Sequence, residues 1–230
     1  MTIPFFPSLN VNDRANDQKP SLVILHYTGT MTMQEAHDIY MMPNTVSPHY
    51  MVDRDGSISQ YVSEDKRAWH AGKSYWRGDT DINSSSIGIE IVNAGHEHTD
   101  KYGGELEIFS DVQMHAVAEL VRGIQARWGI PNQNILGHSD IAVGRKIDPG
   151  EHFPWEFLAS EGIGLLPKLG VKMRDESLFD LLRLWGYDDT QPLELIKKEF
   201  CRHYMRHDFD RDVKDDEMRA ALSSLLHQSQ

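Results

Sequence analysis

Two short apolar runs in this chain each end in a histidine, and they constrain the fold more than any other feature. The first run is Ser21-Leu-Val-Ile-Leu-His26, and the second, far along the chain, is Asn134-Ile-Leu-Gly-His138. A short run of apolar and β-branched side chains indicates a strand that is buried between other elements. Residues 22–26 are therefore predicted to form a buried strand that ends at His26.

The patterns between these two runs alternate between strands and helices. Asp55-Gly56 separates two strand-like segments, which is a strong signal for a β-hairpin. Thr32 and Glu35 have the spacing of a helix capping box. Gly88, inside a predicted strand, suggests the close approach of a neighbouring backbone. Together these segments predict an α/β domain with a mixed central β-sheet flanked by helices, the strands at 50–53, 57–62 and 86–92 and the helices at 32–43 and 110–129.

The ends of the chain differ from this central part. Residues 1–20 are polar and bounded by prolines, which predicts an extended N-terminal arm. The stretch from Leu165 to Gly170 resembles a linker, so we expect one domain over residues 1–170 and a small three-helix domain over 171–230. Helical patterns at 178–185, 193–204 and 217–227 can share a core of Leu178, Leu181, Leu182, Leu195, Ile196, Phe200, Leu222 and Leu225.

The charge balance excludes some classes of partner. Lys and Arg number 23 against 35 Asp and Glu, a formal net charge of −12, whereas nucleic acids and anionic membranes attract basic faces. No apolar run approaches the ~18 residues of a membrane span. The single Cys201 rules out a disulfide within the chain and is expected to be a small buried residue.

His26, His138 and Asp148 are candidate ligands of one metal ion. Asp148 follows His138 by ten residues, in Lys146-Ile-Asp148-Pro149-Gly150. Two imidazoles and a carboxylate are a donor set for catalytic zinc, in which three protein ligands leave a fourth position for water. The chain has 12 histidines, so two unrelated histidines and a turn aspartate could give the same spacing. Spacing alone leaves both interpretations open.

Six ordered stretches add a more specific signal: Ile24-Leu-His-Tyr-Thr28, Val46-Ser-Pro-His-Tyr-Met-Val-Asp-Arg-Asp-Gly56, Lys66-Arg-Ala-Trp-His-Ala-Gly72, Ser86-Ile-Gly-Ile-Glu-Ile-Val-Asn93, Leu136-Gly-His-Ser-Asp140 and Arg145-Lys-Ile-Asp-Pro-Gly150. Together they resemble the zinc-dependent N-acetylmuramoyl-L-alanine amidases of the type 2 amidase family, which is related to the peptidoglycan recognition proteins. They cover most of residues 20–160. Any one stretch alone would be a weak signal, but six in the family's order are specific.

The resemblance implies a fold, a cofactor and a reaction. It implies the fold of type 2 amidases and peptidoglycan recognition proteins, with about one Zn²⁺ per chain bound by His26, His138 and Asp148. The implied reaction is hydrolysis of the amide bond between N-acetylmuramic acid, or its anhydro form, and L-alanine of the stem peptide, in peptidoglycan or muropeptides. A monomer is expected. The N-terminus shows no export signal, so the expected location is cytoplasmic, or the bacterial envelope or periplasm if such a signal is missing from this chain.

The C-terminal residues 171–230 resemble a peptidoglycan-binding helical domain. The alternative is a helical cap that only stabilises the catalytic domain. A binding module predicts that activity on small soluble substrates survives its removal. A cap predicts that activity and stability are lost together, because apolar surface would be uncovered.

Glu90 and Lys146 are the expected catalytic residues. Glu90 alternates with isoleucines in Ile87-Gly-Ile-Glu-Ile91, so on a strand it faces away from them and can face a cleft. A carboxylate there could carry the proton of amide hydrolysis, although a solvent-facing glutamate is the plain alternative. Lys146 lies two residues before Asp148, and an ammonium near the metal could stabilise the oxyanion. The family has a lysine at the matching position; the alternative is a surface lysine.

Four further residues are expected to bind substrate. His70, in Ala68-Trp-His-Ala-Gly72, resembles the family's substrate-side histidine rather than a metal ligand. Tyr75, Trp76 and Arg77 follow on a predicted loop. Aromatic rings stack on sugars and arginine pairs with carboxylates, and muropeptides carry both groups.

A non-catalytic peptidoglycan recognition protein on the same scaffold is the main alternative function. Such proteins typically lose a zinc ligand, whereas this chain keeps all three candidate ligands together with Glu90 and Lys146, which favours the enzyme. A hydrolase with a serine or cysteine nucleophile is disfavoured, because Cys201 lies in the tail and no Gly-x-Ser-x-Gly motif is present. The sequence does not distinguish intact peptidoglycan from soluble anhydro-muropeptides as the main substrate.

Overall fold

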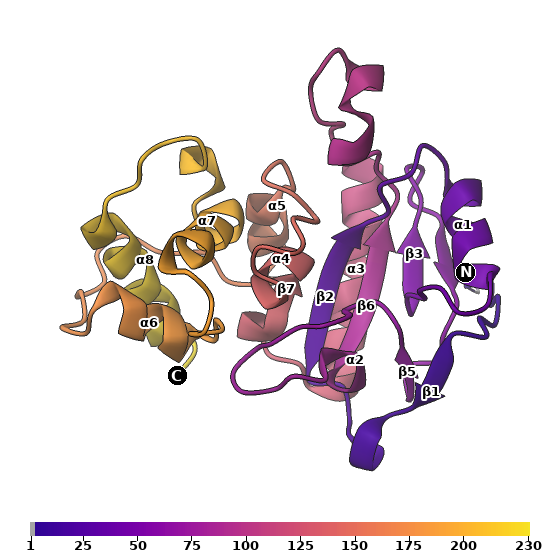
Figure 1. Cartoon of the computed structure of the whole chain (residues 1–230), viewed down its shortest axis with the longest axis horizontal. Coiled ribbons are helices and arrows are strands. Elements are labelled where there is room, and N and C mark those ends of the chain that lie inside the picture. Colours follow the sequence, from indigo (N-terminus) through magenta and orange to yellow (C-terminus); the bar gives the residue numbers. More distant parts are fainter. Residues whose placement is uncertain (1–2) are drawn as a thin grey trace.

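The computed structural model describes residues 3–230 and is built around a five-stranded mixed sheet (Figure 1). The strands of this sheet lie in the order β4-β3-β6-β2-β7. Their bounds are Leu22–Tyr27 for β2, Tyr50–Val52 for β3, Ile58–Gln60 for β4, Ser86–Ile91 for β6 and Ile135–Gly137 for β7. A second, two-stranded sheet pairs β1, Val11–Asp13, with β5, Lys66–Ala68. The predicted α/β architecture with a mixed sheet is confirmed.

Four strands of the main sheet are parallel, and the edge strand β4 is antiparallel to β3. The turn between β3 and β4 contains Asp55 and Gly56, as predicted, and Gly56 has a φ of +81°, which favours glycine. Strand β2 lies between β6 and β7 and is buried along its whole length. Its position in the middle of a sheet covered on both faces explains the unbroken apolar run that ends at His26.

One face of the sheet packs on the long helix α3, Asp111–Trp128, and on α5, Trp155–Ser160. Helix α3 begins where predicted, because the Ser110 side chain accepts a hydrogen bond from the amide of Gln113. This face contributes every second residue of β2 and β6. The cluster contains Val23, Leu25, Ile87, Ile89 and Ile91 from the strands and Val117, Val121 and Ile124 from α3.

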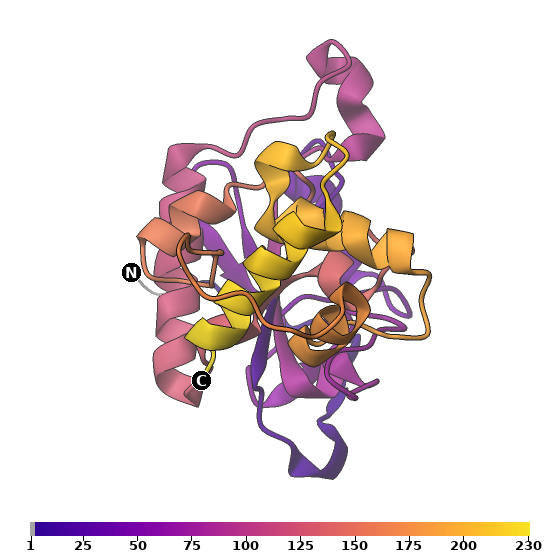
Figure 2. The ribbon, with the colours of Figure 1, turned by 90° about the vertical axis from the view of Figure 1, so that its left-hand side faces the viewer.

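The opposite face is covered in two places. Helix α1, Met33–Met41, covers the β3 side, and it begins with the predicted Thr32–Glu35 capping box. The C-terminal helices cover the β2 and β7 side (Figures 1 and 2). Their bounds are Leu178–Trp185 for α6, Leu193–Tyr204 for α7 and Asp215–Gln228 for α8. Strands β2 and β6 end between helix α1 and the C-terminal helices.

The C-terminal helices and the sheet share one hydrophobic core. Leu22, Ile24 and Leu136 of the sheet belong to the same cluster of buried side chains as Trp185 and Phe200 of the helices. The helices are therefore packed onto the larger part of the protein, and in Figure 2 they lie directly in front of the sheet. The domain boundary near residue 170 stays a prediction.

The N-terminal segment is held down rather than free. Strand β1 pairs antiparallel with β5, and the buried guanidinium of Arg14 donates hydrogen bonds to the carbonyl oxygens of Glu64, Ser84 and Ser86.

Within residues 3–230, no helix is long and apolar enough to cross a membrane.

Two detailed expectations were wrong. A Cβ atom on Gly88 would lie 2.4 Å from the ring of His70, so the close neighbour of this glycine is a side chain and not a backbone. Leu195 was expected in the core of the C-terminal helices, but it is 38 % exposed. It faces Gly144 of the larger part of the protein instead.

Candidate active site

The pairing of β2 with β6 places His26 directly beside Glu90. Both residues project from the face opposite to Ile87, Ile89 and Ile91, which lie in the α3 core. The predicted orientation of Glu90, away from the isoleucines, is therefore confirmed. The two side chains line one cavity of about 470 Å³ at the ends of these strands.

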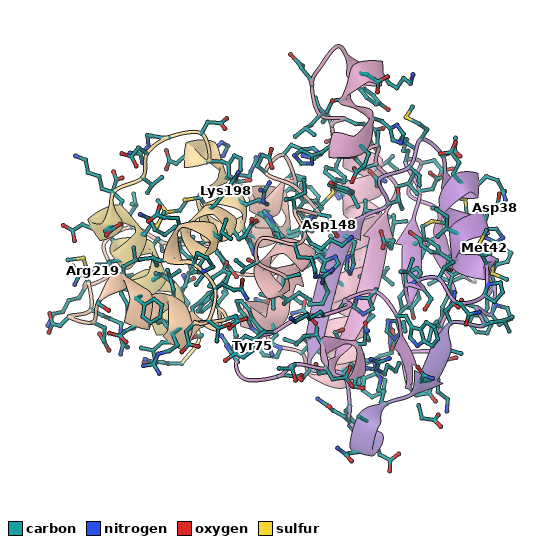
Figure 3. The ribbon with its side chains drawn as sticks, in the orientation of Figure 1. Asp38, Met42, Tyr75, Asp148, Lys198 and Arg219 are labelled. Carbon is teal, nitrogen blue, oxygen red and sulfur yellow. The ribbon has the colours of Figure 1, made fainter. Side chains whose placement is uncertain are left out.

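His138 and Asp148 reach the same place from β7 and the loop after it. Strand β7 pairs parallel with β2, so His138, the first residue of helix α4 (His138–Ile141), stands next to the end of β2. The amide of Ser139 donates a 3.0 Å hydrogen bond to the carbonyl oxygen of Asp148, which ties the loop to α4. In Figure 3, Asp148 lies near the end of β2.

The three predicted ligands form a tight, buried cluster. His26 Nδ1 and His138 Nδ1 lie 2.9 and 3.0 Å from the same carboxylate oxygen, Oδ2 of Asp148, and 3.0 Å from each other. The three side chains are the one group of at least three His, Cys, Asp or Glu residues in the described part of the chain whose ligand atoms lie within 4.8 Å of one another. The cluster can therefore bind a metal ion.

The hydrogen bonds around the cluster fit a cation between these atoms. His138 Nε2 lies 3.0 Å from the carbonyl oxygen of Ala71, which can only accept, and 3.3 Å from Nη2 of Arg145, which can only donate. The shorter contact places the proton on this nitrogen. In its neutral form, the ring then presents a bare Nδ1 to the carboxylate of Asp148. Two acceptors that face each other at 3.0 Å need a proton or a cation between them, and a metal ion satisfies both.

The electrostatics of the cluster favour metal-binding protonation states. Burial, and next the charge of His138, lower the pKa of His26 to about 4, so its ring is neutral near pH 7. Burial alone would raise the pKa of Asp148, but the positive charges that His138 and His26 carry when protonated, together with their hydrogen bonds, hold that pKa far below its ordinary value. Asp148 is therefore an anion, the form that ligates a metal.

Glu90 has the environment of a carboxylate that exchanges a proton. Its Oε2 is buried without a hydrogen-bond partner among residues 3–230. Burial, and next the negative charge of Asp148, raise the pKa of Glu90 well above its ordinary value, while Lys146 and Tyr40 act in the opposite direction. Carboxylates with raised pKa values beside a cluster of ligands are typical of catalytic sites.

Lys146 lies on the rim of the same cavity, where its side chain is exposed. Its positive charge lowers the pKa of His26 as well as that of Glu90, which places the ammonium within electrostatic range of both. The geometry brings together all five of the residues predicted as ligands or catalysts.

His70 also lines this cavity, but it is 7 % exposed and lies behind the ring of His26. Its Nδ1 is 2.9 Å from His26 Nε2, the ring nitrogen that points away from the cluster. Burial, and next the charge of His26, hold the pKa of His70 well below its ordinary value. His70 is thus buried and in direct contact with the predicted ligand His26.

The burial of Trp76 contradicts its expected role in sugar binding, whereas the expected role of Arg77, an exposed residue, stays a prediction. Trp76 is 2 % exposed and packs edge to face on Tyr187, so its ring has no open face for a sugar. The side chain of Arg77 donates a 2.8 Å hydrogen bond to the carbonyl oxygen of Trp185, at the end of helix α6. Both residues hold the loop against the C-terminal helices, a contact between distant segments that the local pattern of aromatic and basic residues does not reveal.

Tyr75 lines a different cavity, between its loop and the C-terminal helices (Figure 3). Its role in substrate binding stays a prediction. Arg145, which sequence reasoning did not single out, is shared by this cavity and the one that holds the ligands. Its guanidinium donates to the carbonyl oxygens of Ala71 and Lys73. A signal was available, because Arg145 begins one of the six ordered stretches.

Asp140 is the second residue that was missed. Its buried carboxylate accepts hydrogen bonds from the amide of Gly137, from the hydroxyl of Tyr187 and from Nδ1 of His203, at 2.8, 2.7 and 2.7 Å. It lies on the turn that carries His138. The C-terminal helices therefore hold the backbone of a metal-ligand segment, and no local pattern indicates these long-range partners.

Comparison with known proteins agrees with this geometry. A family model described as N-acetylmuramoyl-L-alanine amidase (Amidase_2) matches residues 16–151. The N-acetylmuramoyl-L-alanine amidase AmiD of Escherichia coli K12 is 36 % identical over 198 residues, which cover 75 % of this chain and 70 % of AmiD. The 1,6-anhydro-N-acetylmuramyl-L-alanine amidase AmpD of the same organism is 35 % identical over 168 residues, which cover 65 % of this chain and 86 % of AmpD.

Solved structures extend the similarity to the C-terminal helices. E. coli AmiD, in complex with the substrate anhydro-N-acetylmuramic acid-L-Ala-D-γ-Glu-L-Lys, superimposes with a TM-score of 0.78 at 30 % identity and covers 94 % of this chain and 93 % of its own. AmpDh3 of Pseudomonas aeruginosa gives a TM-score of 0.77 at 27 % identity, with 99 % and 98 % covered. With its buried ligand cluster, its adjoining glutamate and these similarities, the chain belongs to the N-acetylmuramoyl-L-alanine amidase family.

Proposed function

We propose that the protein is a zinc-dependent enzyme that hydrolyses the amide bond between N-acetylmuramic acid, or its anhydro form, and L-alanine of the stem peptide. One observation carries the proposal: His26, His138 and Asp148 converge in one cavity with Glu90, whose Oε2 is buried and lacks a hydrogen-bond partner within residues 3–230. Amide hydrolysis requires a cation near the carbonyl and a group that moves a proton, and this cavity supplies sites for both.

The two histidines and Asp148 would hold one zinc ion through Nδ1, Nδ1 and a carboxylate oxygen. When bound, zinc acts as a Lewis acid and lowers the pKa of water toward about 7. Three protein ligands match the catalytic class of zinc sites, which leaves a position open for exchange. The His138 ring is held for this role by its hydrogen bond to Ala71.

Glu90 would carry the proton of the reaction. A carboxylate at this position can take a proton from the attacking water as the new C–O bond forms. It can then deliver that proton to the nitrogen of L-alanine as the C–N bond breaks. The raised pKa of Glu90 suits a group that must hold a proton between these two events.

Lys146 would stabilise the negative charge that develops on the carbonyl oxygen. Lys146 is exposed and lines the same cavity as the candidate ligands. A fixed positive charge at such a position is typically worth a few kcal/mol of transition-state stabilisation.

The C-terminal helices would add affinity for peptidoglycan. The support is that structures of AmiD and AmpDh3 cover at least 94 % of this chain, including these helices. A wall-binding surface would raise the effective concentration of substrate near the cavity. The enzyme would act as a monomer. The substrate would place the enzyme in the cell envelope, or in the cytoplasm if it acts on recycled fragments.

The test compares two substrates side by side. The purified enzyme with zinc is incubated with intact peptidoglycan sacculi and with a soluble anhydro-N-acetylmuramyl peptide, and the products are identified by mass. Release of free peptide with an N-terminal L-alanine is expected from at least one of them, and chelation should abolish it. Binding to sacculi without any peptide release would instead support the non-catalytic recognition protein.

A further inference from the structure

His70 is connected to the predicted ligand His26 on the side away from the metal position. Its Nδ1 lies 2.9 Å from His26 Nε2, and its Nε2 lies 3.1 Å from the hydroxyl oxygen of Ser86. The two rings meet edge to face, with centroids 5.0 Å apart. All three side chains are buried, at 7 % exposure or less, so water contributes little to these contacts.

The direction of each hydrogen bond follows from the last partner in the row. Ser86 Oγ lies 2.5 Å from the carbonyl oxygen of Ile82, and a carbonyl oxygen can only accept. The single hydroxyl hydrogen of Ser86 therefore points to Ile82, and Ser86 Oγ accepts from Nε2–H of His70. A neutral imidazole with its hydrogen on Nε2 has a bare Nδ1.

The direction of the hydrogen bond from His26 to His70 follows in the same way. Because Nδ1 of His70 is an acceptor, Nε2 of His26 must carry the hydrogen of that ring. His26 Nδ1 is then bare, and it is the atom that faces Asp148 and His138. The opposite direction would place a hydrogen on the nitrogen that has to bind the metal.

We propose that His70 is a positioning residue for the metal ligand His26: the row of hydrogen bonds from His26 through His70 and Ser86 to the carbonyl of Ile82 fixes the tautomer and the orientation of the His26 ring. Partners of this kind are general at metal sites, where they typically contribute 10–100-fold to metal affinity. The inference rests on the proposed zinc site. It replaces the substrate-side role expected for His70.

Gly88 leaves the space that the His70 ring occupies. A Cβ atom there would lie 2.4 Å from Cγ of His70, so only glycine on strand β6 leaves the space that His70 occupies. The backbone of Gly88 is held in place by His49, whose Nδ1 accepts a 3.0 Å hydrogen bond from the amide of Gly88. The glycine in this strand is thus explained by the position of the His70 ring.

Two variants of His70 test the proposal. His70→Phe keeps a ring of similar shape over Gly88 but removes the acceptor for His26. His70→Asn is smaller, but its amide oxygen can accept near the position of Nδ1. Zinc affinity is measured by competition with a chromophoric chelator. We expect the dissociation constant to rise about 10–100-fold for Phe and to stay within about threefold of wild type for Asn.

Circular dichroism and the thermal midpoint of the metal-free variants control for folding. A direct measurement needs no variant: long-range ¹H–¹⁵N spectra of the imidazole rings in the wild-type protein should show the hydrogen on Nε2 in both His26 and His70. A hydrogen on Nδ1 of His70 would overturn the proposal even if both variants fail to fold.

Other outcomes separate this inference from the proposed function. If wild-type protein binds zinc but the Phe variant binds it as tightly, the positioning role fails and the enzyme stands. If both variants raise KM at saturating zinc while zinc affinity is unchanged, His70 contacts substrate instead. Absence of zinc binding by the wild type would reject the proposed zinc site and the inference together.

Discussion

Glu90 and the three ligands share one cavity, but substitutions of Glu90 and of the ligands should have different effects on zinc binding and on kcat. Glu90→Gln keeps the shape of the side chain and removes its ability to carry a proton. We expect zinc content and fold to persist while kcat falls by about 100-fold or more, the scale of general acid–base catalysis. Steady-state kinetics together with metal analysis checks this. Near-normal turnover by the Gln variant would leave Glu90 as an ordinary buried strand residue.

A change at His138 should act on the metal itself. His138→Ala leaves two ligands, and a two-ligand site loses affinity steeply. Zinc content measured by mass spectrometry should fall from about one per chain to a small fraction of that. His227→Ala, at an exposed position of helix α8, is the matched control and should retain the metal. Stoichiometric zinc in the His138 variant would show that the ligand is misassigned.

The sequence predicts Glu90, His26 and His138 well because each lies at or beside the end of a short, strongly patterned strand. The alternation of Glu90 with Ile89 and Ile91 is enough to orient the carboxylate toward the face on which His26 lies. Trp76 shows the opposite case. Its type and loop position suggest a ligand surface, but the end of helix α6 covers it. Long-range packing of this kind leaves no local periodicity.

At the level of elements, helix α4 is joined to the C-terminal helices through one buried carboxylate. Asp140 accepts hydrogen bonds from Tyr187 and from His203, whose ring stacks on Trp155 with centroids 3.6 Å apart. Tyr187→Phe removes one donor from a buried acceptor and leaves the shape unchanged. The expected loss in the free energy of unfolding is about 1–3 kcal/mol, measured by urea denaturation.

Tyr75→Phe is the matched control for that change. Tyr75 is half-buried and lines an open cavity, so removal of its hydroxyl should alter stability by less than about 0.5 kcal/mol. Equal effects of the two substitutions would mean that the hydrogen bond from Tyr187 to Asp140 does not contribute measurably to the free energy of unfolding. A larger loss for Tyr187→Phe, accompanied by weaker zinc binding, would connect the C-terminal helices to the turn that carries His138.

At the scale of the whole molecule, a partly buried ion pair between Glu151 and Arg202 of helix α7 should make stability depend on pH. Burial alone would raise the pKa of Glu151, but the hydrogen bond with His96 and the charge of Arg202 on helix α7 lower that pKa to about 2 from 4.5. A depressed pKa gives stability that is present above pH 4.5 and is lost as the pH falls toward 2.

The measurement is the difference in unfolding free energy between wild type and Glu151→Gln across this range. It should be on the order of 2 kcal/mol above pH 5 and shrink steadily toward pH 2. A difference that does not change with pH would mean that Glu151 keeps the same pKa when the protein unfolds.

Truncation after residue 170 tests how far the C-terminal helices are part of the catalytic fold. Their Trp185 and Phe200 lie in one core with Leu22 and Ile24 of strand β2, and burial of each such side chain contributes about 1.5–3 kcal/mol. We therefore expect the truncated chain to melt well below the full chain and to lose activity on soluble muropeptides as well as on sacculi.

Calorimetry of the full chain should show one cooperative transition, because units that share a core unfold together. A truncated chain with an unchanged thermal midpoint and normal kcat on the soluble substrate, but reduced sedimentation with sacculi, would instead identify the helices as a binding module whose packing on the sheet contributes little to stability.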